Sequence, residues 1–115
     1  MPGRWEGTRA YTALRYTCGV AIQGFADKQV ERFFEEDKIP KRVGWASVAS
    51  VARRKLDMLD YANELSDLAS PPGNRLEALK GDLEGFHSIR VNDQWRVIFR
   101  WTPAGPEAVD IDDYH

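Results

Sequence analysis

The first half of the chain places apolar residues at helical spacings. Val30, Phe33 and Phe34 stand at positions i, i+3 and i+4, so they form one stripe along a helix. Asp27 lies just before that stripe, where its carboxylate can accept hydrogen bonds from the first free amides of the helix. A second helix is predicted over residues 45–65, because apolar residues recur there every three or four positions. These residues are Trp45, Val48, Ala52, Leu56 and Leu59.

Alternation of apolar and polar residues replaces helical spacing in the second half of the chain and in one short N-terminal segment. Strands are predicted over residues 20–25, 75–80, 86–91, 94–101 and 107–114. In the fourth strand one face carries Trp95, Val97, Phe99 and Trp101, and the other carries Gln94, Arg96, Ile98 and Arg100. In the last strand Val109 and Ile111 face inward. The order predicts an α+β domain, in which two N-terminal helices pack on one face of a small, mostly antiparallel sheet.

The pairing register of the third and fourth strands stays open at this point. If the turn consists only of Asn92 and Asp93, then Ile89 lies opposite Arg96. In that register apolar residues appear on both faces of the hairpin. A slip by one residue exchanges these neighbours, and the sequence does not choose between the two registers.

The length of 115 residues suits one domain with one modest core. Residues 1–19 differ from the rest because they follow no clear hydrophobic period. We predict that they form a loosely held N-terminal extension, followed by a folded domain over residues 20–115. The alternative is that translation begins at Val20, so that the extension is not made.

Composition narrows the classes of function. The net charge is −2, so any contact with nucleic acid requires a local cluster of cations. The single cysteine, Cys18, excludes an internal disulfide and a multi-cysteine metal site, and it suits a reducing compartment. No run approaches the roughly 20 apolar residues of a membrane span, and the N-terminus lacks the apolar core of a signal peptide. We therefore expect a cytoplasmic protein that uses neither metal nor cofactor.

Four cations among the predicted strands are the first candidates for chemistry. They are Lys80, Arg90, Arg96 and Arg100. A phosphoryl transition state gathers negative charge that positioned cations stabilise, and an arginine can bind two phosphate oxygens at once. A solvated sheet face on which these cations pair with carboxylates is the more frequent meaning of such a pattern.

The end of the chain carries two further candidates. His115 titrates near neutral pH, so it can give or take a proton when a 2′-hydroxyl of RNA attacks the adjacent phosphate. Tyr114 can stack on a base or act as an acid. On position alone, a frayed terminus is the more frequent explanation for both residues.

Glu77 precedes Lys80 by three residues, so an ideal strand would direct them to opposite faces. They can converge only if the strand bends or ends there, which Gly81 permits. The Glu77 carboxylate can serve as a general base, or as an edge charge that prevents aggregation. His87, in the middle of a predicted strand, is expected to be a structural residue bonded to a partner.

The predicted helices carry a basic zone, which could follow an RNA backbone. It consists of Lys38, Lys41, Arg42, Arg53, Arg54 and Lys55. The last three are expected to fall largely off the buried face of the second helix. Solvated helix surface is the more frequent explanation of such a zone.

Four segments stand in a fixed order along the chain. They read ARRKLDMLDYA in residues 52–62, LKGD in 79–82, SIRVNDQWRVIFRW in 88–101 and DYH in 113–115. Together they resemble the HigB-type branch of the RelE/ParE-like toxins of bacterial toxin–antitoxin systems. The resemblance implies a RelE-like fold and an endoribonuclease that cuts mRNA in the A site of the 70S ribosome. It also implies a HigA-like helix-turn-helix antitoxin from the same operon, through which the toxin reaches operator DNA.

The resemblance also implies roles for single residues. Lys80 matches the lysine of the family's LKG segment, Arg96 the arginine of its QWR strand, and both would stabilise charge. The terminal Asp113, Tyr114 and His115 match its Asp-Tyr-His ending, with Tyr114 orienting a base and His115 transferring a proton. This chain departs from the family at Glu77, where many members have histidine. Either Glu77 serves as the base with His115 as the acid, or the site works with fewer groups.

Two alternatives to the nuclease stay open, and the departure at Glu77 supports the first of them. A ParE-like protein of the same fold would poison DNA gyrase without catalysis and would cause DNA damage in place of translation arrest. A decayed toxin would bind only its antitoxin and, through it, operator DNA. The terminal tyrosine and histidine favour the nuclease.

Overall fold

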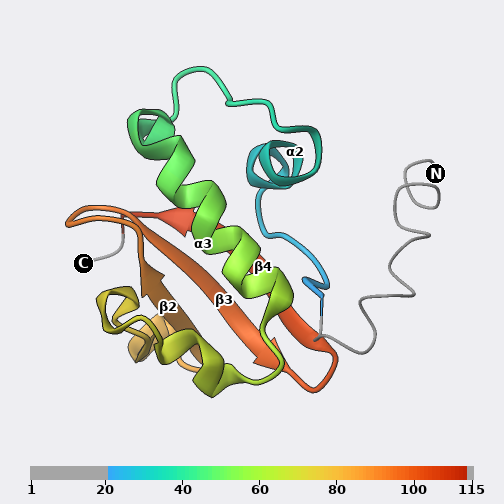
Figure 1. The fold of residues 1–115 in the computed structure, drawn as a ribbon, viewed down its shortest axis with the longest axis vertical. Coiled ribbons are helices and arrows are strands. Elements are labelled where there is room, and N and C mark those ends of the chain that lie inside the picture. The colour runs from blue at the N-terminus through green and yellow to red at the C-terminus, as the bar shows by residue number, and fades with distance from the viewer. Residues whose placement is uncertain (1–20, 114–115) are drawn as a thin grey trace.

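The computed structural model describes residues 21–113, which form an α+β domain (Figure 1). The α-helices are α2 (Lys28–Glu36) and α3 (Ala49–Tyr61), and the strands are β1 (Glu77–Ala78), β2 (Phe86–Arg90), β3 (Arg96–Thr102) and β4 (Gly105–Asp112). The 3-10 turns are η2 (Gly44–Val48), η3 (Leu65–Ala69), η4 (Pro72–Asn74) and η5 (Gly81–Leu83). The sheet is antiparallel in the order β1-β2-β3-β4, so the predicted fold class is confirmed. Within this stretch, none of the helices has the length and apolar character needed to cross a lipid bilayer.

Helix α2 forms as its sequence predicts. The Asp27 carboxylate accepts a hydrogen bond from the Gln29 amide at 2.7 Å, which caps the first turn. The apolar stripe Val30, Phe33 and Phe34 is buried against the sheet and α3. The helix ends at Glu36, because the next residue adopts a left-handed backbone conformation.

The second helix is shorter than the predicted span of residues 45–65. It begins as the 3-10 turn η2, where the indole of Trp95 lies so close to Gly44 that a Cβ there would stand 2.3 Å from the ring. It ends at Tyr61, because Ala62 is extended and the Asp67 carboxylate accepts hydrogen bonds from the next two amides. A tertiary contact at the start of the helix and a local capping contact at its end therefore override the helical pattern.

The register of the β2–β3 hairpin is the slipped one. Ile89 pairs with Val97 and Arg90 with Arg96, so the register that places Ile89 opposite Arg96 is wrong. The connection is longer than two residues: the Val91 amide donates to the Trp95 carbonyl at 2.9 Å. This register is favoured because it lets two fully buried aliphatic side chains, Ile89 and Val97, meet on the same face.

Several predicted strands are shorter than expected. In place of the strand predicted over residues 20–25, the described residues 21–25 make a single parallel bridge, Phe25 with Val109, and the Gln23 amide donates to the Pro106 carbonyl at 2.7 Å. The strand predicted over residues 75–80 is reduced to β1, because the left-handed backbone of Arg75 precedes it and η5 follows.

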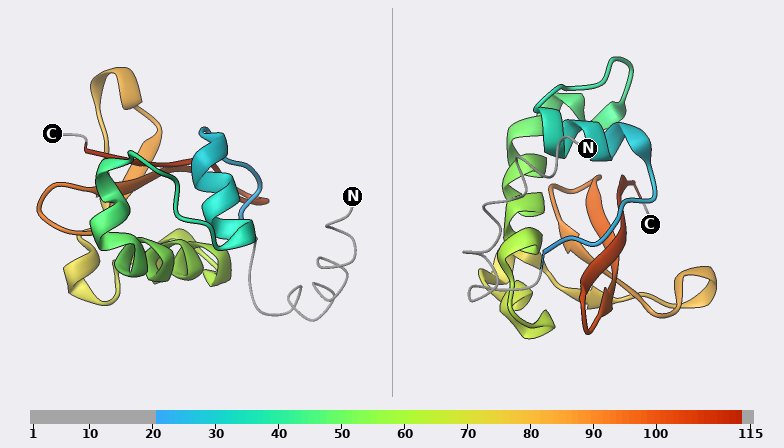
Figure 2. Two further views of the ribbon diagram at one scale, coloured as in Figure 1. Left: turned by 90° about the horizontal axis from the view of Figure 1, so that it is seen from above. Right: turned by 90° about the vertical axis from the view of Figure 1, so that its right-hand side faces the viewer.

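The helices and the sheet form separate layers, which are visible when the sheet is seen edge-on. Helix α3 lies on one side of the sheet, with α2 beside it, and the loop that contains η5 rises on the other side (Figure 2). The main core cluster lies between the helices and the sheet. Its sheet contribution comes from Ile89, Val97, Phe99, Val109 and Ile111. Because strand residues alternate between faces, their neighbours point to the other side, which we call the open face.

Candidate active site

The open face gathers charged residues from three strands. The pairing of Glu77 with Ser88 and of Ser88 with Ile98 places β1, β2 and β3 side by side. Alternation then puts the candidate cations of β2 and β3 on this face together with the β1 carboxylate. The set consists of Glu77, Phe86, Ser88, Arg90, Arg96 and Arg100, and we call it the open-face cluster.

Arg96 stands at the centre of the cluster and is held from two sides. Its Nη1 lies 3.8 Å from the Glu77 Oε1 and donates to the Ser88 Oγ at 3.4 Å. Ser88 is fully buried, so its hydroxyl contacts the guanidinium away from solvent. The Arg96 side chain is only 20% exposed, whereas that of Glu77 is 54% exposed. The guanidinium is thus pre-oriented but still reaches solvent, as an anion-binding group must.

Lys80 lies at the exposed end of β1, where the chain enters η5. The strand ends there and Gly81 takes a positive φ of 69°, so the ideal-strand argument against convergence with Glu77 no longer applies. Within residues 21–113 no hydrogen bond or ion pair holds the Lys80 ammonium. It is therefore available for an anionic ligand.

The other two arginines of the open-face cluster are neutralised locally. Arg90 pairs with Asp93 of the hairpin connection. Arg100 contacts the Glu107 carboxylate, with Nη2–Oε2 at 2.5 Å, and its guanidinium lies 5.4 Å from the centre of the Phe86 ring. These pairs are typical of a solvated sheet face, on which cations pair with carboxylates. Arg96 and Lys80 are therefore the better candidates for binding a phosphate.

The last described residues extend the open face along β4. Arg96 pairs with Asp112 across the β3–β4 ladder. Asp113 follows immediately, is exposed, and donates its amide to the Asp112 Oδ1 at 2.8 Å. The predicted site residues Tyr114 and His115 lie outside the described residues.

Asp110 is a titratable open-face residue that the sequence analysis did not single out. It pairs with Ile98 in the β3–β4 ladder. Burial raises the pKa of its carboxyl, a hydrogen bond from the Ile111 amide opposes this, and the charges of Asp27 and Asp112 add to the increase. Its alternation with the buried Val109 and Ile111 is a signal that could have placed it on this face.

The cations of α3 have mainly internal contacts. Arg53 links the two helices, because its guanidinium contacts Asp37 at 3.1 Å, Asp57 at 3.4 Å and the Phe34 ring at 5.1 Å. Arg54 is exposed. Of the two arginines that α3 contributes to the basic zone, Arg54 is therefore exposed to solvent, whereas Arg53 fixes α2 to α3.

The expectation that Lys55 falls off the buried face is wrong. Lys55 is buried, and its ammonium donates to the Asn74 Oδ1 at 2.5 Å. Burial lowers the pKa of Lys55, and the nearby charges of Arg54 and Arg90 lower it further. Asn74, itself fully buried, donates to the Leu68 and Ser70 carbonyls, so this pair fixes the loop before β1 to α3.

His87 is structural, but it is not bonded as expected. Its side chain points to the helical side of β2 and stacks on Phe99, with ring centres 6.1 Å apart. Its Nδ1 is buried and has no hydrogen-bond partner in the described part of the chain. Among residues 21–113 there is also no group of three or more histidine, cysteine, aspartate or glutamate side chains arranged to hold a metal ion.

Comparison with known proteins identifies the family of the chain. Residues 23–115 match the family described as the RelE-like toxin of the type II toxin–antitoxin system HigB. Toxin HigB-1 of Vibrio cholerae is 49% identical over 77 residues, which is 67% of this chain and 80% of that protein. An uncharacterised protein of Haemophilus influenzae is 37% identical over 81 residues, covering 67% and 75% of the two chains.

A third relative carries an activity in its name. Endoribonuclease HigB of Proteus vulgaris is 31% identical over 94 residues, which is 82% of this chain and 99% of that protein. The family match covers the whole described domain except its first two residues. The chain therefore belongs to the RelE-like HigB family, the toxins of type II toxin–antitoxin systems.

Proposed function

We propose that this toxin is an endoribonuclease that cleaves mRNA on translating 70S ribosomes and so inhibits translation in the cytoplasm. The observation that carries the proposal is the central guanidinium of Arg96, oriented by Glu77 and Ser88 and accessible from the open face. The free ammonium of Lys80 adds a second cation at the edge of β1. A relative named as an endoribonuclease supports the reaction class.

The end of the chain supplies the remaining groups. In this proposal His115 acts beside Arg96, because it follows Asp112, the β4 partner of Arg96, by three residues in the sequence. Tyr114 would stack on or orient a base, and Asp113 would hold the terminal segment in place.

The reaction then divides into two proton transfers. A base takes the proton of the 2′-hydroxyl while its oxygen forms a bond to the adjacent phosphorus. The bond from phosphorus to the 5′-oxygen breaks, and an acid protonates that oxygen. We assign the acid to His115 and the base to Glu77, whose long contact with Arg96 leaves oxygen atoms free for a proton. Arg96 and Lys80 stabilise the negative charge of the transition state.

In this proposal the surrounding cations contribute unequally to RNA binding. Arg54 is exposed, and Arg90 and Arg100 lie on the open face with one carboxylate partner each. Arg53 and Lys55 support them indirectly, because their contacts are internal. A HigA-like helix-turn-helix antitoxin from the same operon would silence the toxin and carry it to operator DNA.

A non-catalytic, ParE-like gyrase poison is the second candidate. The observation in its favour is that each arginine of the open-face cluster already has a carboxylate neighbour, which weakens its attraction for phosphate. Such a protein would bind gyrase through this face and cut no RNA.

Primer-extension mapping of mRNA on translating ribosomes separates the two candidates. The wild-type protein is compared with His115→Ala and Lys80→Ala, with free mRNA as the substrate control. Lys28→Ala, an exposed lysine of α2, is the matched control variant. We expect cuts only on ribosomes, lost in the first two variants and kept in Lys28→Ala. Absence of cuts by folded wild-type protein, with inhibition of gyrase supercoiling, would establish the alternative.

A further inference from the structure

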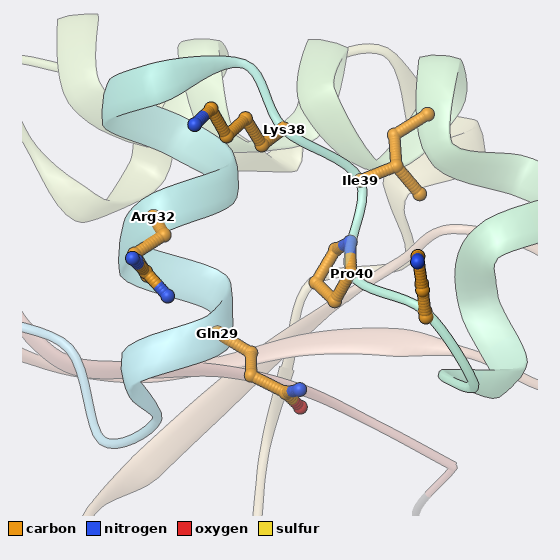
Figure 3. A pocket seen from close by; sticks show the side chains of 6 residues that line it. Gln29, Arg32, Lys38, Ile39 and Pro40 are labelled. Atoms are coloured by element: carbon orange, nitrogen blue, oxygen red, sulfur yellow. The ribbon is translucent and has the colours of Figure 1, made fainter.

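A pocket in the helical layer lies away from the open face. It has a volume of about 430 Å³ and lies between α2 and the connection that leads to η2. It is lined by Gln29, Arg32, Lys38, Ile39, Pro40 and Lys41. Figure 3 shows Gln29 and Arg32 on α2, with the ring of Pro40 on the side of the connection that faces them.

The charge of this pocket has one sign. Three of its six lining residues are cations and none is acidic. Lys38 has one weak neighbour, Glu36, at 4.0 Å. Neither Arg32 nor Lys41 has an ion-pair or hydrogen-bond partner within the described residues. Because the whole chain carries a net charge of −2, this concentration of positive charge is local and selects an anionic ligand.

The apolar residues of the pocket favour an anionic peptide over a nucleic acid. Ile39 is 53% exposed and, with Tyr61, is one of two large hydrophobic side chains left exposed in the described part of the chain. Pro40 lies beside it in the lining. No aromatic ring lines the pocket, so it has no surface on which a nucleic-acid base would stack. An apolar centre inside a charged rim is typical of protein–protein interfaces, and a cationic rim is complementary to an acidic partner.

We infer that this pocket binds an acidic peptide segment of a protein partner, with one aliphatic side chain seated against Ile39 and Pro40. The carboxylates on either side of that anchor contact Arg32, Lys38 and Lys41. The inference does not depend on ribonuclease activity, because none of these residues belongs to the open-face cluster. An antitoxin is the protein partner that the family of this chain implies.

The test uses three probes of equal charge and the full chain. The first probe is a blocked pentapeptide with one leucine between two pairs of glutamates, and the second has serine in place of leucine. The third is a five-nucleotide oligouridylate without terminal phosphates. Each is titrated into isotopically labelled protein, and amide chemical shifts report both the affinity and the location of binding. We expect the leucine peptide to shift amides of the pocket and to bind about ten-fold more tightly than the serine peptide.

Variants then assign the contacts. Arg32→Glu and Lys41→Glu should each weaken binding of the leucine peptide about ten-fold, whereas Ile39→Ser should remove the preference for leucine over serine. Arg75→Glu is the matched control, because it makes the same change of charge at an exposed arginine outside the pocket. Equal binding of the two peptides, tighter binding of the oligouridylate, equal weakening by Arg75→Glu or no shift at the pocket would each overturn the inference.

Discussion

The two faces of the sheet use the same strands for opposite purposes. On the helical face Val97, Phe99 and Val109 are completely buried, so burial alone determines their positions. On the open face Arg96 and Glu77 keep contact with solvent and are positioned by polar contacts at 3.4–3.8 Å. Alternation along β3 therefore lets one strand contribute both core residues and candidate catalytic residues. Changes on one face should therefore leave the other largely intact.

The strongest test of this separation removes a core ring. Phe99→Ala deletes a fully buried side chain and leaves a cavity, so it should lower the free energy of unfolding by about 3–5 kcal/mol. Urea denaturation measures the loss. Phe86→Ala is the matched control, because its half-buried ring lies on the open face under Arg100. An equal loss in the control would show that the open face is also core.

The next change acts on the open face. Arg96→Ala should reduce ribosome-dependent cleavage by roughly 100- to 1000-fold, because a positioned cation is removed from the transition state. Arg100→Ala should reduce it much less, since Glu107 already neutralises that guanidinium. Both rates are measured by primer extension on proteins with matched unfolding curves. Equal effects of the two variants would mean that the cluster acts as a diffuse electrostatic surface.

A smaller loss of stability is expected from a change at Asn74, which joins the loop before β1 to α3. Asn74→Ala removes the acceptor of the Lys55 ammonium and should lower the free energy of unfolding by about 1–3 kcal/mol. Urea denaturation is again the measurement. The double variant Lys55→Met with Asn74→Leu should recover part of the loss, because no ammonium group is then buried without its acceptor. Failure to recover would show that the bonds from Asn74 to the Leu68 and Ser70 carbonyls matter more.

The smallest effect concerns pH. Because the pKa of Asp110 is raised above 3.8 in the folded protein, the folded state binds this proton more strongly than the unfolded chain does. Stability therefore falls as pH rises from 3.8 through the folded-state pKa, and the charged form is unfavourable at neutral pH. Asp110→Asn keeps an acceptor for the Ile111 amide and should stabilise the protein at neutral pH by no more than about 0.5 kcal/mol.

The control for this change is Glu84→Gln, which neutralises an exposed carboxylate of the loop after η5. Thermal unfolding between pH 3 and 8 compares the two variants with the wild-type protein. The advantage of Asp110→Asn should disappear at the acidic end of the range. A constant advantage at every pH would point to a packing effect and not to charge.

Much of the site could be predicted because its residues belong to short patterns. The alternation in residues 94–101 placed Arg96 and Arg100 on the face opposite Val97 and Phe99, and the structure agrees. The contact of Arg96 with Glu77 could not be predicted, because it joins two strands that are not neighbours, across β2. The roles of Tyr114 and His115 remain predictions from family resemblance.

Periodicity and capping within a few residues are enough to predict the two helices, the apolar stripe of α2 with its Asp27 cap, and the antiparallel meander. The β2–β3 register, the shortness of β1 and the burial of Lys55 against Asn74 are visible only in the folded protein. The register and the burial of Lys55 depend on packing between groups from different elements, and β1 is cut short by the backbone at Arg75 and by η5. The intrinsic preference of a short segment for helix or strand does not predict these contacts, because they depend on how the whole core packs.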